Sequence, residues 1–171
     1  MNKRKLIIFD FDGVLINSEK NMQLTWNKTI ESLEGYNIHF NEYKKNIGLP
    51  FNKILEKLNI KKKDFKKITY NYKKNSIHYQ NKIKLFKGIK LLIRKLKKKY
   101  KIALFTSKDK FRTNFLLKKF NLKFDAVIAG NDVKRGKPHP EGLKKIMKKL
   151  SFKRKNIFYI GDTRFDYNCS K

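Results

Sequence analysis

The chain has 171 residues, which is enough for one domain or for one domain with an insertion. It carries 44 Lys and Arg residues against 14 Asp and Glu residues, which gives a formal charge of +30 at pH 7. The single cysteine, Cys169, excludes an internal disulfide bond, and no apolar run approaches the roughly 20 residues of a membrane-spanning helix. We therefore expect a cytoplasmic protein that has no membrane partner.

Four short apolar runs predict buried β-strands. They are Leu6–Phe9, Ile102–Phe105, Ala126–Ala129 and Ile157–Ile160. Each run is continuous rather than alternating, which is typical of parallel strands that are covered on both faces. Apolar residues recurring every three to four positions predict helices around residues 89–100, 111–120 and 143–150. Strands that alternate with amphipathic helices indicate an α/β fold with a Rossmann-like parallel sheet.

The connection between the first two predicted strands is too long for a simple crossover. It contains further helical periodicity around residues 22–33, 51–58 and 65–72. Because a long structureless loop is rare in a compact domain, we predict that residues 17–84 form an inserted helical cap. The α/β core would then comprise residues 1–16 and 85–171.

Polar and charged residues follow each of the four predicted strands. In chain order they are Asp10 and Asp12, then Thr106 and Ser107, then Gly136-Lys137-Pro138, and finally Gly161-Asp162 with Asp166 a turn later. Ligands of open α/β sheets lie beyond the carboxyl ends of the strands. We therefore expect these side chains to meet at one edge of the sheet.

Several carboxylates at one edge repel one another, and a bound cation relieves that repulsion. Oxygen ligands suit Mg²⁺, which commonly binds carboxylates together with substrate phosphate. Thr106, Ser107 and Lys137 add donors for phosphate oxygens. The pattern therefore indicates phosphoryl transfer, in which catalysis rests mostly on positioning and charge neutralisation.

Four stretches carry a resemblance to a known family. "DFDGVL", "LFTSK", "GKPHPE" and "GDTRFD", in this order and spacing, resemble the four motifs of the haloacid dehalogenase superfamily. The place of the helical insertion resembles the subgroup whose cap follows the first motif. Within the cap, "NIGLPFNKIL" is similar to phosphoglycolate phosphatases and related pyrophosphatases.

The resemblance implies roles for the four aspartates. Asp10 would be the nucleophile that forms an aspartyl phosphate, and it would also bind the metal. Asp12 would be the general acid and base, with its main-chain carbonyl on Mg²⁺. Asp162 would be a further Mg²⁺ ligand, and Asp166 beside it would support the site.

The resemblance also implies roles for four other residues. Thr106 and Ser107 would hold the phosphate, and Lys137 would neutralise the aspartyl phosphate. Gly13 would permit the turn between core and cap. These roles imply a Mg²⁺-dependent phosphatase acting on a small phosphorylated metabolite.

A β-phosphoglucomutase-like isomerase with the same core and cap is the alternative enzyme. Such mutases carry a His in the first cap helix and an Arg shortly after the cap glycine, where this chain has Met22 and Phe51. Their fourth motif contains Glu-Asp, whereas this chain has "GDTRFD". These differences favour the phosphatase.

The net charge leaves an alternative of another class, a basic RNA-associated protein or an inactive fragment on the same fold. Lysine outnumbers arginine 38 to 6, and the lysines are scattered along the chain. Because Lys has AT-rich codons and nucleic-acid binders draw more on Arg, we interpret the charge as codon drift. We expect no nucleic-acid partner.

The C-terminal end departs from the family pattern. Family members continue through a helix to a fifth strand, whereas this chain stops at Lys171, soon after Asp166. We therefore expect a truncated core whose strands, numbered along the chain, lie in the order 4-1-2-3. The Ile157–Ile160 strand would then form a rim of the sheet.

Overall fold

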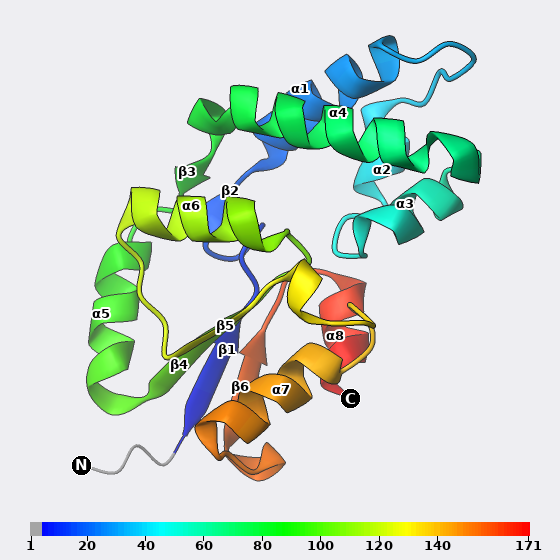
Figure 1. Cartoon of the computed structure of the whole chain (residues 1–171). Helices are drawn as coiled ribbons and strands as arrows, with labels where there is room; N and C mark the ends of the chain where they lie inside the picture. The colour runs from blue at the N-terminus through cyan, green and yellow to red at the C-terminus, as the bar shows by residue number, and fades with distance from the viewer. Residues whose placement is uncertain (1–4) are drawn as a thin grey trace.

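A four-stranded parallel sheet forms the centre of the core. In the computed structural model, which describes residues 5–171, its strands are β1 (Leu6–Phe9), β4 (Lys101–Phe105), β5 (Ala126–Ile128) and β6 (Ile157–Ile160). Their order in space is β5-β4-β1-β6, and all neighbouring pairs are parallel (Figure 1). The predicted α/β fold and strand order are thereby confirmed.

Two strand boundaries differ slightly from the prediction. The strand β4 begins at Lys101, whose main-chain N–H already donates to the carbonyl of Lys5. The strand β5 ends before Ala129, whose N–H donates to the Asp132 carboxylate at the start of a 3₁₀ turn, Gly130–Asp132. A side chain therefore takes over the hydrogen bond that a longer ladder would have required.

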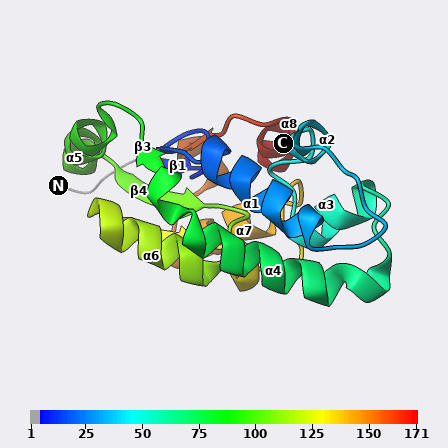
Figure 2. The same ribbon diagram turned by 90° about the horizontal axis from the view of Figure 1, so that it is seen from above.

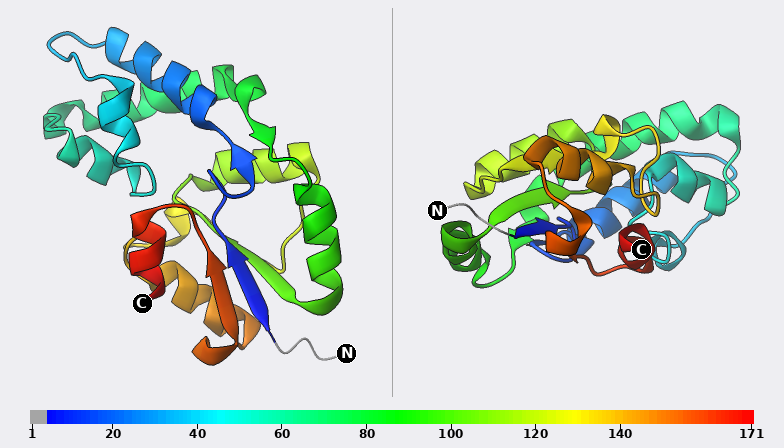
Figure 3. Two further views of the ribbon diagram at one scale, coloured as in Figure 1. Left: turned by 180° about the vertical axis from the view of Figure 1, so that it is seen from behind. Right: turned by 90° about the horizontal axis from the view of Figure 1, so that it is seen from below.

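Helices cover both faces of the sheet, because successive side chains of each buried strand point to opposite faces. On one face, α5 (Ile89–Lys99) and α6 (Lys110–Phe120) pack over Ile7 and Phe9 of β1. On the other face, α7 (Glu141–Leu150) and α8 (Arg164–Ser170) pack over Leu6 and Ile8. Figure 3 shows β6 at one rim of the sheet, where Phe158 is 51% exposed.

The cap is helical and has its own apolar core. It contains α1 (Glu19–Glu31), α2 (Phe40–Lys44), α3 (Phe51–Lys57) and α4 (Phe65–His78), and α1 lies beside α4 (Figure 2). Trp26, fully buried at its centre, stacks on Tyr43 with ring centroids 4.5 Å apart and donates its indole N–H to the Ile38 carbonyl. Within residues 5–171, none of the helices combines the length and apolar character that crossing a lipid bilayer requires.

A short antiparallel ribbon joins the cap to the core. It pairs β2 (Ile16–Asn17) with β3 (Lys84–Leu85). Strands of two residues are too short to show a period in the sequence, so the pattern did not predict them. We propose that this ribbon is the boundary between the core and the predicted cap, residues 17–84.

Close packing of α7 on the sheet depends on Gly142. A Cβ at this position would lie 2.2 Å from the Phe105 ring, so Gly142→Ala must push the helix away from the sheet. Overpacking of this kind typically costs about 1–3 kcal/mol of unfolding free energy. We expect urea unfolding to show that loss, while Lys144→Ala on the exposed side of the same helix stays near wild type. Equal stability of the two variants would contradict this account of the packing.

Candidate active site

A buried lysine between two aspartates forms the centre of the site. Lys137 Nζ lies 2.8 Å from Asp10 Oδ1 and 2.7 Å from Asp166 Oδ1, and the lysine side chain is fully buried. Its ammonium group also lies over the rings of Phe105 and Tyr159, 5.1 and 5.7 Å from their centroids. Two carboxylates therefore share one ammonium group in a place that water does not reach.

The electrostatics of Asp10 are unusual for a carboxylate. Burial raises the pKa of Asp10 to about 7, and repulsion by Asp166 and Asp12 adds to the rise, while Lys137 opposes it. Burial alone would lower the pKa of Lys137, but Asp10 and Asp166 outweigh burial and raise it. The ammonium group therefore stays charged, and Asp10 binds its proton more tightly than an ordinary carboxyl group does.

Asp166 is anchored by the start of α8. Its Oδ2 accepts hydrogen bonds from the hydroxyl of Thr163 at 2.6 Å and from the Thr163 N–H at 3.1 Å, and Thr163 caps the helix in return. The Tyr159 hydroxyl donates to Oδ1 at 2.5 Å. Burial raises the pKa of Asp166, but Lys137 and these donors outweigh burial and lower it. Asp166 is therefore held as a fixed carboxylate.

Three carboxylates lie close enough to share one cation. Ligand oxygens of Asp10, Asp162 and Asp166 lie within 4.8 Å of one another. Asp162 is exposed, yet partial desolvation raises its pKa. Asp10 Oδ1 is buried and makes no hydrogen bond of good geometry, although it is ion-paired with Lys137. An all-oxygen set with an incompletely satisfied buried oxygen fits a hard divalent cation such as Mg²⁺.

Gly13 makes the approach of Asp162 possible. A Cβ on Gly13 would lie 1.9 Å from Asp162 Oδ2, and the residue has a φ of +79°, in the left-handed region that favours glycine. The glycine of the first motif therefore does more than turn the chain toward the cap. It clears the space in which the fourth motif meets the first.

Asp12 faces a different set of partners from Asp10. Its Oδ1 accepts a hydrogen bond of 2.5 Å from Ser18 Oγ and lies 3.2 Å from Lys108 Nζ. Within residues 5–171, no group donates a hydrogen bond to Oδ2 of Asp12, so this oxygen remains available for proton transfer. Burial lowers the pKa of Lys108, although Asp12 opposes that effect.

Sequence reasoning missed Lys108. As one lysine among 38, it carried no signal beyond its place directly after Thr106-Ser107. Only the structure distinguishes Lys108 from the exposed lysines, because its side chain in the loop after β4 is only 4% exposed.

Thr106 and Ser107 lie at the carboxyl end of β4. Thr106 is buried, and its hydroxyl accepts a hydrogen bond from the N–H of Lys108 at 3.2 Å. The Ser107 hydroxyl donates to the carbonyl of Gly48 in the cap at 2.6 Å. Ser107 therefore ties the cap to the core at the site.

The loop that carries Lys137 is fixed by Glu141. The two carboxylate oxygens of Glu141 accept hydrogen bonds from the N–H groups of Lys134 and Arg135 at 3.0 and 2.9 Å. These two donors lower the pKa of Glu141 to about 2. The "GKPHPE" stretch thus folds back on itself and delivers Lys137 inward.

The structure brings the predicted site residues together at the carboxyl edge of the sheet. Asp10, Asp12, Thr106 and Ser107 line a cavity of about 70 Å³ under the cap. Lys137 and Asp166 meet Asp10 from one side, and Asp162 completes the acidic cluster. The predicted site residues therefore lie together, and their catalytic roles stay predictions.

Removal of Lys137 should destabilise the fold strongly. Lys137→Met leaves Asp10 and Asp166 buried without a counter-charge, which typically costs about 3–5 kcal/mol. The same substitution at Lys101, whose ion pair with Asp125 is partly exposed, should cost less than about 1 kcal/mol. Urea unfolding of chelator-treated protein compares the two variants.

The loss of unfolding free energy in Lys137→Met should depend on pH in a defined direction. In the wild type, the lowered pKa of Asp166 gives stability that is present at neutral pH and is lost in acid. Without Lys137 the pKa of both carboxyl groups rises, and protonation in mild acid relieves their repulsion. The difference from wild type should therefore be larger at about pH 7 than at about pH 5. A difference that grows as the pH falls would contradict the ion-pair assignment.

Comparison with known proteins gives a consistent result. The family model described as haloacid dehalogenase-like hydrolase matches residues 7–171. Pyrophosphatase PpaX of Bacillus mycoides (strain KBAB4) is 30% identical over 172 residues, which cover 96% of this chain and 77% of that protein. A solved structure from Bacteroides fragilis, assigned to the haloacid dehalogenase-like hydrolases, has a TM-score of 0.90 at 26% identity and covers 98% of this chain and 83% of its own.

A second solved structure is similar to this chain in its fold alone. It comes from Lactobacillus plantarum and is assigned as a phosphoglycolate phosphatase. Its TM-score is 0.84 at 21% identity, and the match covers 99% of this chain and 82% of that one. The cap is included in this likeness, because nearly the whole chain is matched.

Proposed function

Because the chain belongs to the haloacid dehalogenase-like hydrolase family, we propose that it is a Mg²⁺-dependent phosphatase that acts on a small phosphorylated metabolite. The family membership that the four motifs predicted is confirmed, and it makes the chain an enzyme that acts on phosphoester substrates. One relative is named for pyrophosphate and one structural neighbour for phosphoglycolate. Both compounds present a terminal phosphoryl group on a small molecule.

The observation that carries the proposal is the acidic cluster around Lys137. A carboxylate nucleophile needs a neighbouring cation while it takes up the charge of a phosphoryl group, and Lys137 Nζ lies 2.8 Å from Asp10 Oδ1. Asp162 adds an oxygen for a divalent cation, and Asp166 supports the cluster. A site that only bound an anion would gain nothing from three clustered carboxylates.

In the first half-reaction, an oxygen of Asp10 attacks the phosphorus atom of the substrate. The bond between phosphorus and the leaving oxygen breaks, and its electron pair stays on that oxygen. Asp12, entering this step protonated, donates its proton to the leaving oxygen. Thr106 and Lys137 orient the phosphoryl oxygens, and the product is an aspartyl phosphate on Asp10.

In the second half-reaction, Asp12 takes a proton from water, and the water oxygen attacks the phosphorus. The bond to Asp10 breaks, which restores the free carboxylate and releases inorganic phosphate. Asp10, the main-chain carbonyl of Asp12 and Asp162 would hold Mg²⁺, with Asp166 supporting the site. When bound, the ion supplies positive charge that offsets repulsion between carboxylate and phosphoryl oxygens.

The cavity lining argues against the mutase alternative. Met22 and Phe51 occupy the positions where mutases carry His and Arg, and both line the cavity that contains Asp10. Neither side chain can transfer a proton or bind a second phosphate of a sugar bisphosphate. A phosphatase needs neither function at these positions.

Metal and nucleophile should both be required for activity. Hydrolysis of pyrophosphate or phosphoglycolate should stop on addition of a chelator and return with excess Mg²⁺. Asp10→Asn should abolish turnover, because a neutral amide is a poor nucleophile and a poor cation ligand. Asp64→Asn is the matched control, since Asp64 lies in the cap and accepts a hydrogen bond from Tyr36. Metal-dependent turnover by Asp10→Asn would remove Asp10 from its proposed role.

The side chain of Asp12 should contribute to the reaction through proton transfer. Asp12→Asn keeps the shape of the side chain and can still accept the hydrogen bond from Ser18. We expect kcat to fall by about 10²–10⁴-fold, the usual contribution of general acid and base catalysis, and thermal stability to fall as well, because buried Lys108 loses its charged partner. Steady-state kinetics on a substrate with a poor leaving group checks this, and wild-type kcat in Asp12→Asn would exclude the role.

A further inference from the structure

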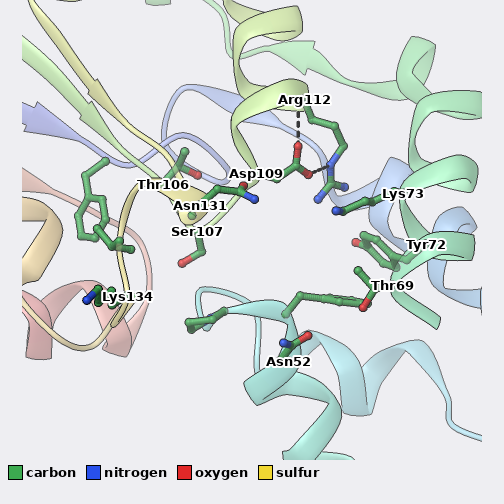
Figure 4. A pocket seen from close by; sticks show the side chains of 16 residues that line it. Asn52, Thr69, Tyr72, Lys73, Thr106, Ser107, Asp109, Arg112, Asn131 and Lys134 are labelled. Carbon is green, nitrogen blue, oxygen red and sulfur yellow. Dashed lines mark hydrogen bonds and ion pairs between the residues drawn. The ribbon is translucent and has the colours of Figure 1, made fainter. Parts of the chain in front are cut away.

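A second cavity opens beside the candidate active site, between the cap and the core. It has a volume of about 240 Å³ and is lined by Tyr72 and Lys73 of α4 and by Ser107, Arg112 and Lys134 of the core, among others (Figure 4). Pockets for drug-sized ligands are typically about 300–1,000 Å³, so this cavity suits a smaller group.

This cavity adjoins the one that contains Asp10. Thr106, Ser107 and Arg112 line both, and so do Phe51 and Tyr72 of the cap. The second cavity therefore lies next to the place where a phosphoryl group would meet Asp10.

The charge of the second cavity is positive. Its lining contains the cations Lys73, Arg112 and Lys134 and one carboxylate, Asp109. Asp109 is already engaged, because it accepts hydrogen bonds from both the main-chain N–H and the guanidinium of Arg112. The lining therefore carries more positive than negative charge, as a site for an anion requires.

Arg112 is held in place before any ligand binds. Its side chain is 16% exposed, its Nη1 donates to Ser76 Oγ of α4 at 2.9 Å, and its guanidinium lies over the Tyr72 ring, 5.5 Å from the centroid. Arg112 thus bridges α6 of the core and α4 of the cap. A donor fixed in this way loses little entropy when it binds an anion.

We propose that the second cavity receives the leaving group of the substrate and that Arg112, helped by Lys73, selects a leaving group that is itself anionic. The inference rests on the proposed phosphatase function and adds the chemistry of the substrate. The selected group is a phosphate or a carboxylate that is separated from the transferred phosphoryl group by a few atoms at most. Nε of Arg112 is bonded to Asp109 and Nη1 to Ser76, so the remaining N–H groups of the guanidinium would bind such a group.

An open groove on the other side of Asp12 is the competing place for the leaving group. Its volume is about 790 Å³, and its lining includes Lys44, Lys45 and Asp162. Its size and width suit the entry of solvent and substrate more than the recognition of a small anion. A variant in this groove therefore serves as the control.

The test compares three substrates of similar size, all with Mg²⁺ present. Phosphoglycolate has a carboxylate in its leaving group, pyrophosphate has a phosphate, and 2-hydroxyethyl phosphate is the neutral counterpart of phosphoglycolate. We expect Arg112→Met to lower kcat/KM about 10- to 100-fold for one or both anionic substrates, the usual worth of a charged hydrogen bond. The value for 2-hydroxyethyl phosphate should change less than about threefold. The anionic substrate that loses more identifies the preferred group.

Two further variants keep the test decisive if Arg112→Met folds poorly. Lys73→Met changes an exposed side chain on the cavity wall and should give the same selective loss on a smaller scale. Lys45→Met removes the same charge from the competing groove and should leave the substrate preference unchanged. Selective loss in Lys45→Met instead would place the leaving group in the groove and overturn the inference.

The outcomes separate the inference from the function on which it rests. The anionic subsite is refuted, and the phosphatase function is not, if the wild type hydrolyses all three substrates without preference. The same conclusion follows if Arg112→Met lowers kcat/KM equally on all three substrates and Lys73→Met lowers it on none. No Mg²⁺-dependent hydrolysis of any phosphorylated substrate by the wild type refutes the proposed function, and the subsite falls with it.

Discussion

The ion pairs of one buried ammonium group hold the site together. Lys137 Nζ stands between Asp10 and Asp166 at 2.8 and 2.7 Å, in a position that water does not reach. Buried charges persist only when they are paired, so each of these groups requires the others. The same arrangement leaves the pKa of Asp10 raised to about 7 by burial, which a further cation would offset. The ion pairing that stabilises the structure and the proposed chemistry thus use the same three side chains.

The fold brings Asp10, Lys137 and Asp166 together because the carboxyl ends of the parallel strands meet at one edge of the sheet. The first strand delivers Asp10, the loop braced by Glu141 delivers Lys137, and the capped start of α8 delivers Asp166. Lys137 and Asp166 are placed by local devices, a carboxylate on main-chain N–H groups and a helix cap. Asp10 is placed by the pairing of β1 in the sheet, where its N–H donates to the carbonyl of Ile160. The cap then closes over the edge, with Ser107 bonded to the carbonyl of Gly48.

The sequence predicted what depends on short local patterns and missed what depends on contacts across the chain. Continuous apolar runs such as Leu6–Phe9 identified all four strands of the parallel sheet. The order of the motifs placed Asp10 and Lys137 at the same edge of that sheet. By contrast, Arg112 and Lys108 are two cations among 44, and only burial against Tyr72 and Asp12 distinguishes them. The space that Gly13 clears for Asp162 was equally hidden, because the two residues lie far apart in the chain.

The central claim is that Asp10 carries the phosphoryl group during turnover, and trapping that group on the protein tests it most directly. Radiolabelled pyrophosphate or phosphoglycolate, whichever is hydrolysed faster, would be mixed with protein and Mg²⁺ and quenched in acid early in the first turnover. The account predicts a label that hydroxylamine removes, located by peptide mapping on the segment that contains Asp10. A label on another residue, or turnover with no labelled protein at the earliest quench, would contradict it.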